Sequence, residues 1–377
     1  MKKMLMLASV ASMIDQFNMP NIQLLQEMGY EVHVACNFEK GNTCTSEKIQ
    51  NLKKNLKNIG VKYYQIDFNR NILKISEILK AYKQVKKLLL RENYNFIHCH
   101  SPIGGAVGRI AAHKTHIKVI YTAHGFHFYK GAPLLNWLLY YPIEKWLSRY
   151  TDVLITINKE DYQRAKKKFH AKEIKYVPGV GIDVEKIRAV QVDRKAKRKE
   201  LGIAEDDFFL LSVGELNKNK NHEVVIRALA ELKNPKIKYA ICGQGSLKEY
   251  LEELAEKLGV RKQLFLLGFR TDVIEICKSA DVFVFPSRRE GLSVALMEAM
   301  ACGVPCVVSD IRGNRDLIDE SGGCVFNLSK HGLIKKELEN IILNKQRVYK
   351  GSNNSNKALQ YDIRKINSLM KKIYLSC

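Results

Sequence analysis

The chain has 377 residues and carries 62 Lys and Arg against 39 Asp and Glu, a formal net charge of +23. This length exceeds one ordinary hydrophobic core and predicts two domains. An apolar content of 46% and a charged content of 27% are typical of globular proteins, and they exclude a disordered or collagen-like chain. The excess of positive charge favours an anionic partner: nucleic acid, an anionic membrane surface or a phosphorylated small molecule.

Nine cysteines occur without a C-x-x-C pair, so we expect free thiols in a reducing compartment, with Cys242, Cys277 and Cys324 buried. The first 12 residues resemble either a short signal peptide or a buried first strand, and the helical pattern that follows favours the strand. No apolar run reaches the roughly 18–20 residues that span a bilayer. We therefore expect a cytoplasmic protein that can also lie on the inner face of the cell membrane.

Short apolar runs alternate with amphipathic stretches along the chain, which predicts α/β units with parallel sheets. In the first half, the expected strands are Lys3–Val10, Glu31–Cys36, Lys62–Asp67, Phe96–His100, Val119–Thr122 and Val153–Ile157. The expected helices between them are Pro20–Met28, Glu47–Ile59, Leu73–Glu92, Gly105–Lys114 and Pro133–Arg149. In the second half, the expected strands are Phe208–Val213, Lys238–Cys242, Leu264–Leu267, Val282–Pro286 and Pro305–Ser309. Its helices are Glu223–Leu232, Leu247–Leu258, Val273–Lys278 and Ser293–Cys302.

The alternation is interrupted around Val177–Asp183, where Pro-Gly and a second Gly break regular structure. The expected fold is therefore two Rossmann-like, doubly wound domains, residues 1–185 and 186–356, with a ligand crevice at the carboxyl ends of the strands. Residues 352–356 are expected to form a loop. A final helix, about residues 357–377, is expected to pack back on the first domain.

The segment from Phe283 to Pro305 contains the most informative strand-to-helix turn. Ser293 is a good N-cap for an apolar helix that Gly303 closes, Glu290 precedes this helix, and Glu298 lies in its second turn. The amides of residues 291–293 (Gly291, Leu292 and Ser293) then form an anion site at the amino end of the helix, suited to a diphosphate. A glycosidase built on the two glutamates is disfavoured, because hydrolases need carboxylates that face each other across the bond.

This segment resembles the E-x7-E signature of glycosyltransferase family 4, whose members are retaining enzymes with the GT-B fold. The resemblance implies that Glu290 contacts the donor sugar and that Glu298 holds the ribose hydroxyls of a nucleotide sugar. It also implies a reaction without metal or other cofactor. Family members of the capsule and exopolysaccharide branch are the most similar.

Three further turns match the donor side of the family. Gly214 and Lys220 resemble its V-G-R-L-x-x-x-K-G segment, whose basic residues bind the donor diphosphate, but Glu215 stands where arginine is usual. Lys218 is a candidate for the missing charge. The other two turns contribute the loop glycines and the residues expected beside the nucleotide base: Gly243, Gly245, Phe269 and Arg270.

Histidines follow two neighbouring strands of the first domain. His124 resembles the family histidine near the donor sugar and the attacking hydroxyl, and His127 is the second choice. His98 and His100 end the preceding strand and should face the same crevice. The spacing also allows a zinc site, but no carboxylate or cysteine completes an obvious ligand set. We predict His124 and Glu290 as catalytic residues and no metal ligand.

Fewer sequence features indicate which residues bind the acceptor. Residues 9–21 form the first turn and should line the acceptor entrance, with Asp15 and Asn18 accompanied by His100 and His127. The aromatic and basic segment 129–149, together with the lysines of 48–57, suits contact with anionic lipid. Ordinary packing of the aromatics against the core explains the first segment equally well.

The expected function is transfer of a sugar from a nucleotide diphosphate, UDP-hexose or UDP-N-acetylhexosamine, to a lipid-linked oligosaccharide in surface glycan synthesis. The charge on a leaving diphosphate would be stabilised mainly by positioned cations and amides. Two alternatives stay open: a UDP-sugar epimerase of the same fold, and a basic nucleic-acid-binding protein. No helix-turn-helix, zinc-finger or RNP motif supports the second, so no nucleic-acid partner is expected.

Overall fold

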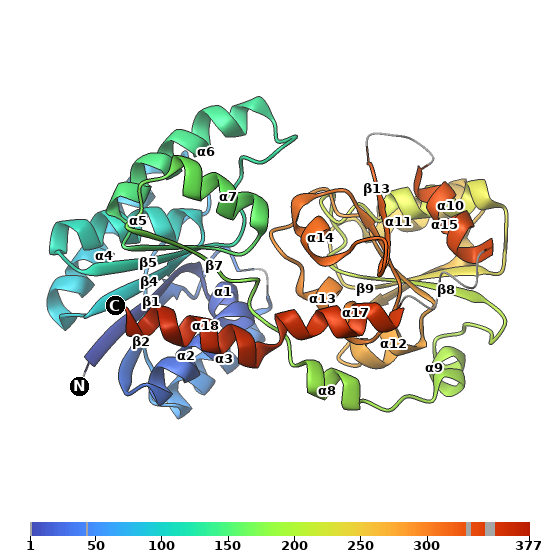
Figure 1. The fold of residues 1–377 in the computed structure, drawn as a ribbon, viewed down its shortest axis with the longest axis horizontal. Helices are drawn as coiled ribbons and strands as arrows, with labels where there is room; N and C mark the ends of the chain where they lie inside the picture. The colour runs from blue at the N-terminus through green and yellow to red at the C-terminus, as the bar shows by residue number, and fades with distance from the viewer. Residues whose placement is uncertain (1, 43, 329–332, 344–350) are drawn as a thin grey trace. The chain divides into compact units, whose positions relative to one another are not determined.

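The computed structural model describes residues 2–42, 44–328, 333–343 and 351–377, and the chain divides into two compact units (Figure 1). Unit 1 comprises Met1–Val180 and Lys365–Cys377, and unit 2 comprises Gly181–Arg364. The boundary expected between residues 185 and 186 thus lies a few residues beyond this division.

The described residues of unit 1 form a parallel seven-stranded sheet in the order β3-β2-β1-β4-β5-β6-β7. Its strands are β1 (Lys2–Val10), β2 (Tyr30–Asn37), β3 (Lys62–Gln65), β4 (Phe96–His100), β5 (Lys118–Ala123), β6 (Val153–Thr156) and β7 (Glu173–Tyr176). The first residues expected to form a strand therefore do so, as an interior strand between β2 and β4.

Helices cover both faces of this sheet (Figure 1), so its interior strand β1 is buried from Met4 to Val10. Met4 and Met6 of β1 belong to one core cluster, whereas Leu5 and Leu7 belong to the other, as the alternation of side chains along a strand requires. The helices of unit 1 up to residue 180 are α1 (Ala11–Phe17), α2 (Met19–Glu27), α3 (Ser46–Asn58), α4 (Ile75–Glu92), α5 (Pro102–Thr115), α6 (Leu134–Leu147), η1 (Ser148–Tyr150) and α7 (Lys159–Lys168).

The described residues of unit 2 form a parallel six-stranded sheet in the order β10-β9-β8-β11-β12-β13. Its strands are β8 (Phe208–Val213), β9 (Ile237–Cys242), β10 (Leu264–Gly268), β11 (Val282–Phe285), β12 (Cys306–Ser309) and β13 (Gly323–Phe326). Its helices up to residue 343 are α8 (Val184–Ala189), α9 (Arg194–Glu200), α10 (Glu223–Leu232), α11 (Lys248–Lys257), η2 (Arg261–Gln263), α12 (Val273–Ser279), α13 (Val294–Ala301), α14 (Arg312–Leu317) and α15 (Leu333–Leu343). Both sheets have their strands in the doubly wound arrangement that the alternation predicts.

The C-terminal part of the chain differs from the sequence-based expectation. Residues 352–356, expected as a loop, belong to helix α17 (Gly351–Ala358). The reason is a tertiary contact, because the buried amide of Asn354 donates to the carbonyls of Val304 and Gly322 at 2.9 and 2.7 Å. The short polar side chains that favour a loop are thus used to hold a helix in place.

The single helix expected from residue 357 is broken into three parts. After α17 come η3 (Leu359–Tyr361) and α18 (Ile363–Leu375). At the break, the amide of Ile182 donates to the carbonyl of Tyr361, and its own carbonyl accepts from the amide of Ile363. From Lys365 onward the chain belongs to unit 1, where Ile366, Met370, Ile373 and Tyr374 join a core cluster.

Two smaller expectations also need correction. The expected first turn, residues 9–21, contains α1 and the start of α2, with Asn18 between the two helices. Cys324 is only partly buried, because it lies on the edge strand β13, whereas Cys242 and Cys277 are buried as expected. No helix within the described residues is both long enough and apolar enough to cross a bilayer.

Candidate active site

The carboxyl ends of β8, β9 and β10 in unit 2 approach one another closely. The amide of Gly214 donates to the carbonyl of Cys242 at 2.9 Å, and the amide of Gly243 donates to the carbonyl of Gly268 at 2.7 Å. A Cβ on Gly243 would lie 1.9 Å from the carbonyl oxygen of Gly214, and one on Gly245 would lie 2.4 Å from that of Leu216. Glycine is therefore required for packing at 243 and 245, whatever else these loops bind.

Lys220 and Glu290 meet at this end of the same sheet. The Lys220 Nζ lies 2.8 Å from the Glu290 Oε1, and the two side chains are 19% and 15% exposed. The ammonium also lies over the ring of Phe285, 4.7 Å from its centroid, in a cation–π contact. Lys220 is thus held by a strand-end aromatic and by a carboxylate of a different loop.

Further hydrogen bonds join the loop after β8 to the loop after β11. The amide of Arg288 donates to the carbonyl of Asn219 at 2.8 Å, and the Asn219 Nδ2 donates to the carbonyl of Arg289 at 3.0 Å. The guanidinium of Arg288 also donates to the Asn221 Oδ1 at 3.0 Å. The two loops therefore form one surface, and residues 214–222 and 286–293 are positioned together.

The amino end of α13 has the capping that its sequence predicts. The Ser293 hydroxyl accepts from the amide of Leu296, and the helix is followed by Gly303 in the left-handed region, at φ 73°. Within the described chain, the amides of Gly291, Leu292 and Ser293 donate to no protein acceptor. Three free amides before an apolar helix form a ready anion site, because the helix dipole adds positive potential there.

Glu298 lies on α13 beyond this amino end and is only partly exposed. Burial raises the pKa of its carboxyl to about 7, because water solvates the charged form poorly there. The two glutamates of the motif thus differ: Glu290 is ion-paired, whereas Glu298 is a desolvated carboxyl.

The residues expected beside a nucleotide base have different environments. Phe269 is 68% exposed, whereas the guanidinium of Arg270 is bound to Glu200 at 2.7 Å and to Asp272. Arg270 therefore already has carboxylate partners in unit 2. Glu215, which replaces the usual arginine, is exposed, and so is Lys218.

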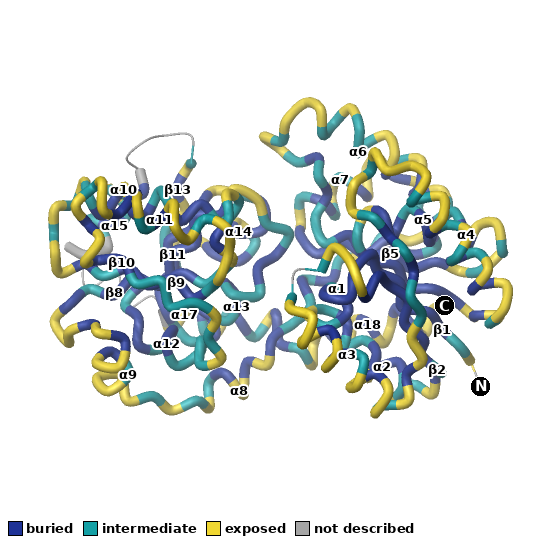
Figure 2. Tube along the Cα trace, turned by 180° about the vertical axis from the view of Figure 1, so that it is seen from behind, coloured by how far each residue is buried: buried dark blue, intermediate teal, exposed yellow. Residues whose placement is uncertain are grey.

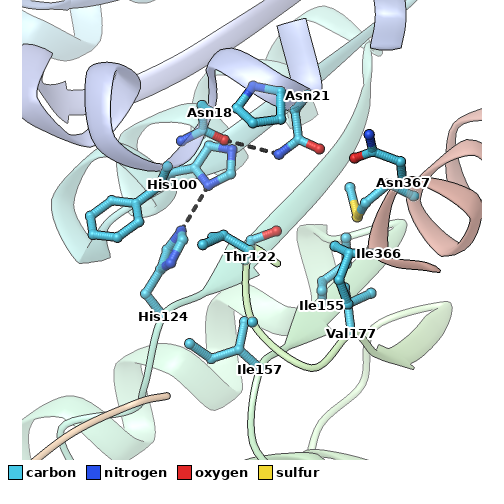
Figure 3. Close-up of a pocket in the computed structure, with 15 residues that line it drawn as sticks. Asn18, Asn21, His100, Thr122, His124, Ile155, Ile157, Val177, Ile366 and Asn367 are labelled. Carbon is cyan, nitrogen blue, oxygen red and sulfur yellow. Dashed lines mark hydrogen bonds between the residues drawn. The ribbon is translucent and has the colours of Figure 1, made fainter. Parts of the chain in front are cut away.

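Unit 1 contains a small hollow at the carboxyl ends of its strands, with a volume of about 20 Å³ (Figure 3). It is lined by β-strand ends, by the start of α2 and by α18: Phe17, Asn18, Pro20, Asn21, His100, Thr122, His124, Ile155, Ile157, Val177, Gly179, Val180, Ile366, Asn367 and Met370. The hollow thus brings together three of the predicted residues, Asn18, His100 and His124.

Histidines of adjacent strands are linked beside this hollow. The His100 Nδ1 lies 3.0 Å from the His124 Nε2 (Figure 3), and the ring of His98 packs 4.1 Å from that of His100. Burial lowers the pKa of His98 to about 3 and that of His124 to about 4. Burial also lowers the pKa of His100 well below its usual value, with the two neighbouring histidines contributing. All three rings are therefore neutral at pH 7.

Two predicted acceptor-side residues, His127 and Asp15, do not line the hollow. His127 stacks on Tyr140 of α6, with ring centroids 4.6 Å apart, and Asp15 of α1 pairs with Lys48 at 3.7 Å. Asn18 is fully buried and donates to the carbonyl of Met13. Asn18 therefore shapes the wall of the hollow.

The sequence interpretation missed the contribution of the C-terminal helix. Ile366, Asn367 and Met370 line the hollow, and the hydroxyl of Tyr374 lies 3.0 Å from the His98 Nδ1. The sequence interpretation expected this helix to pack back on the first domain, but it did not identify the residues that the helix contacts. Among the described residues, no three His, Cys, Asp or Glu side chains are grouped as a metal site requires.

Comparisons with known families match both halves of the chain. The family model described as Glycosyltransferase Family 4 matches residues 22–186, and the one described as Glycosyl transferases group 1 matches residues 193–358. EpsD of Bacillus subtilis (strain 168) is 38% identical over 348 residues, which cover 90% of this chain and 87% of EpsD. The UDP-Gal:alpha-D-GlcNAc-diphosphoundecaprenol alpha-1,3-galactosyltransferase of Escherichia coli is 33% identical over 269 residues, 69% of each chain.

Solved structures show the same fold at low sequence identity. HepE of Anabaena, in complex with UDP and glucose, matches with a TM-score of 0.79 and 19% identity over 100% of both chains. Sucrose-phosphate synthase of Thermosynechococcus elongatus matches with a TM-score of 0.80 and 16% identity over 100% of this chain and 99% of its own. The fold is GT-B, with two Rossmann-like domains, and the chain is a glycosyltransferase that belongs to glycosyltransferase family 4.

Proposed function

We propose that the enzyme transfers a sugar, with retention of anomeric configuration, from a UDP-sugar to a hydroxyl of a lipid-linked glycan. The observation that carries the proposal is the Lys220–Glu290 pair beside the free amides of residues 291–293. A diphosphate needs cations and N–H donors, and a sugar needs carboxylates that accept from its hydroxyls. Both kinds of group are present on one surface of unit 2.

On this proposal, Lys220 and the amides before α13 stabilise the negative charge that grows on the leaving UDP. Glu290 accepts hydrogen bonds from the donor sugar, and Glu298 accepts them from the ribose. Phe269, which is exposed, offers an aromatic face for the uracil base. No metal or other cofactor takes part in the proposed reaction.

The identity of the acceptor rests on the relatives. The galactosyltransferase of Escherichia coli acts, by its name, on a sugar linked to diphosphoundecaprenol. A Campylobacter jejuni relative, 37% identical over 137 residues, is named for transfer to a diphospho-undecaprenol-linked sugar. We extend the same acceptor class to this chain, in the synthesis of a capsule or exopolysaccharide.

A lipid-linked acceptor places the enzyme at the cytoplasmic face of the cell membrane, and α6 offers a surface for that contact. Leu134, Leu135 and Leu138 are 73%, 70% and 67% exposed, and Trp146 is 46% exposed (exposed parts of α6 are yellow in Figure 2). At about 100° per residue, these four side chains fall within a sector of about 120° on the helix. Trp137, Tyr140 and Tyr141 of the same helix pack on the core, which leaves the exposed leucines for the proposed membrane contact.

The test uses the purified full-length chain, a panel of UDP-sugars and diphosphoundecaprenol-linked acceptors. We expect one UDP-sugar to be consumed only when acceptor is present, with an α-to-α product identified by NMR when the donor is an α-linked UDP-sugar. Glu290→Ala should abolish transfer, whereas Glu256→Ala, an exposed glutamate of α11, should not. Release of an epimerised sugar without acceptor would instead identify an epimerase, and tight salt-resistant binding of nucleic acid would contradict the proposal.

A further inference from the structure

His100 lies between two partners that differ in what they can donate. Its Nε2 lies 3.2 Å from the Sδ of Met6, and its Nδ1 lies 3.0 Å from the Nε2 of His124. Met6 is fully buried on the interior strand β1, and His100 is 1% exposed. Neither ring nitrogen of His100 can therefore exchange its protein partner for bulk water.

The position of the protons follows from these partners. A thioether sulfur can accept a hydrogen bond weakly but has no proton to donate. A protonated His100 Nε2 can donate to this sulfur, whereas an unprotonated one would lie against it without a hydrogen bond. The contact therefore favours the proton on Nε2, and in a neutral ring this leaves Nδ1 as an acceptor. The only donor available to that acceptor in the 3.0 Å contact is the His124 Nε2.

The same reasoning then applies to His124. A neutral ring protonated at Nε2 has an unprotonated Nδ1, and within the described chain the His124 ring makes its hydrogen bond through Nε2. Burial keeps the pKa of His124 at about 4, so the ring stays neutral at pH 7. His124 also borders the hollow of unit 1, which has room for a polar group of a ligand.

We propose that His100 is a positioning residue that, through Met6, fixes His124 as the Nε2-protonated tautomer and so presents the His124 Nδ1 to a sugar hydroxyl as a hydrogen-bond acceptor. The buried Met6 sulfur thus determines which ring nitrogen of His124, two residues along the hydrogen-bond chain, carries the proton. Only the identity of the ligand hydroxyl rests on the proposed function. The tautomer of His124 is a property of the free enzyme and is measured without substrate.

The first measurement is ¹⁵N NMR of the imidazole rings of the full-length chain at pH 7. The resonances of His124 are assigned by their loss in His124→Asn. We expect a protonated Nε2 and an unprotonated Nδ1 for His124, and the same pattern for His100. A His124 ring protonated at Nδ1, or at both nitrogens, overturns the proposal whether or not the enzyme transfers sugar.

The second measurement uses Met6→Leu, which removes the sulfur while nearly conserving volume. Without an acceptor for the His100 Nε2 proton, both tautomers of His100 become accessible, and the His124 spectrum should show a mixture. The kcat of transfer should fall roughly 2- to 10-fold with the donor KM unchanged, as expected for loss of one hydrogen bond of fixed polarity. Met4→Leu, an equally buried methionine of the same strand, is the matched control and should change neither readout.

A third pair of variants separates positioning from packing. In His100→Asn, the amide oxygen takes the place of the ring Nδ1 and can still accept from His124. In this variant His124 should therefore stay protonated at Nε2, and the enzyme should keep most of its kcat. In His100→Leu, His124 should lose this preference and the kcat should fall. Equal spectra and equal kcat for the two variants, or for Met6→Leu and Met4→Leu, would show that His100 only fills space and would overturn the proposal.

Discussion

The ammonium of Lys220 and the carboxylate of Glu290 lie 2.8 Å apart, on loops that follow two different strands of one sheet. Without a ligand, each neutralises the other. A bound nucleotide diphosphate would give Lys220 a second anionic partner, and a donor sugar would give Glu290 hydroxyl donors. The pair therefore keeps two oppositely charged groups available at a partly buried surface.

Lys220→Met should weaken UDP binding by roughly 10- to 100-fold, because one charge-assisted hydrogen bond to phosphate contributes about 1.5–3 kcal/mol. Isothermal titration calorimetry with UDP measures the change. Lys218→Met is the matched control, since Lys218 is an exposed lysine of the same loop. An equal loss in both variants would contradict a specific role for Lys220.

Glu298→Gln should change how stability depends on pH. Burial raises the pKa of Glu298 to about 7 in the folded chain, above its value when unfolded. The folded state therefore binds more protons between about pH 4.5 and 7, and the free energy of unfolding falls as the pH rises through this window, by at most ~3 kcal/mol. Glutamine removes this loss.

Urea unfolding of the wild-type chain and Glu298→Gln at pH 5 and pH 8 checks this prediction. The variant should be the more stable of the two at pH 8, and the difference should shrink at pH 5. Glu253→Gln, an exposed residue of α11, serves as the control. A variant whose stability follows the wild-type pH profile would show that Glu298 is not the group responsible.

His124→Ala should lower kcat by at least roughly 10-fold, because it removes a polar group at the hollow of unit 1. His127→Ala should have a much smaller effect, because His127 stacks on Tyr140 and does not line the hollow. Burial lowers the pKa of His124 to about 4. Wild-type activity should therefore not titrate near the ordinary histidine pKa of about 6.5.

Initial rates at saturating donor, measured from pH 5 to 8, check both statements. A comparable loss of kcat in His127→Ala would identify His127 as a functional histidine and contradict the choice of His124. A rate that halves near pH 6.5 and is restored to pH independence in His124→Asn would show that His124 is exposed to solvent in the working enzyme.

Replacing Leu134, Leu135 and Leu138 with glutamate should lower partitioning onto vesicles that contain phosphatidylglycerol by at least roughly 10-fold. Sedimentation with vesicles measures bound and free protein. Leu375→Glu is a control, because Leu375 of α18 is 70% exposed but lies on another helix. Wild-type protein that stays in the supernatant at low salt would remove the membrane contact from the proposed function.

Local patterns predicted the fold well, because each strand and helix depends mainly on its own residues. The Ser293 cap, the closure of α13 at Gly303 and the buried first strand all follow from short-range chemistry. The helical structure of residues 352–356 does not follow from local chemistry. The buried amide of Asn354 overrides the loop preference of its neighbours through contacts with residues about 30 and 50 positions away.

The candidate site shows the same difference between features set by local sequence and features set by tertiary contacts. A family resemblance singled out Lys220, Glu290 and His124 one at a time, but their hydrogen-bond partners depend on tertiary structure. The ion pair of Arg270 with Asp272 is local, whereas that with Glu200 spans 70 residues. The contact of His98 with Tyr374 spans 276 residues, and no local pattern contains it.

Unit 2 is continuous along the chain, whereas unit 1 is completed by residues 365–377, which follow unit 2 in the sequence. Because domains generally fold as units during synthesis, unit 2 can close its core while unit 1 still lacks Ile366, Met370 and Tyr374. Unit 1 begins earlier in the chain than unit 2, but it would then finish folding later. His98 beside the hollow gains its Tyr374 partner only after all of unit 2 has been synthesised.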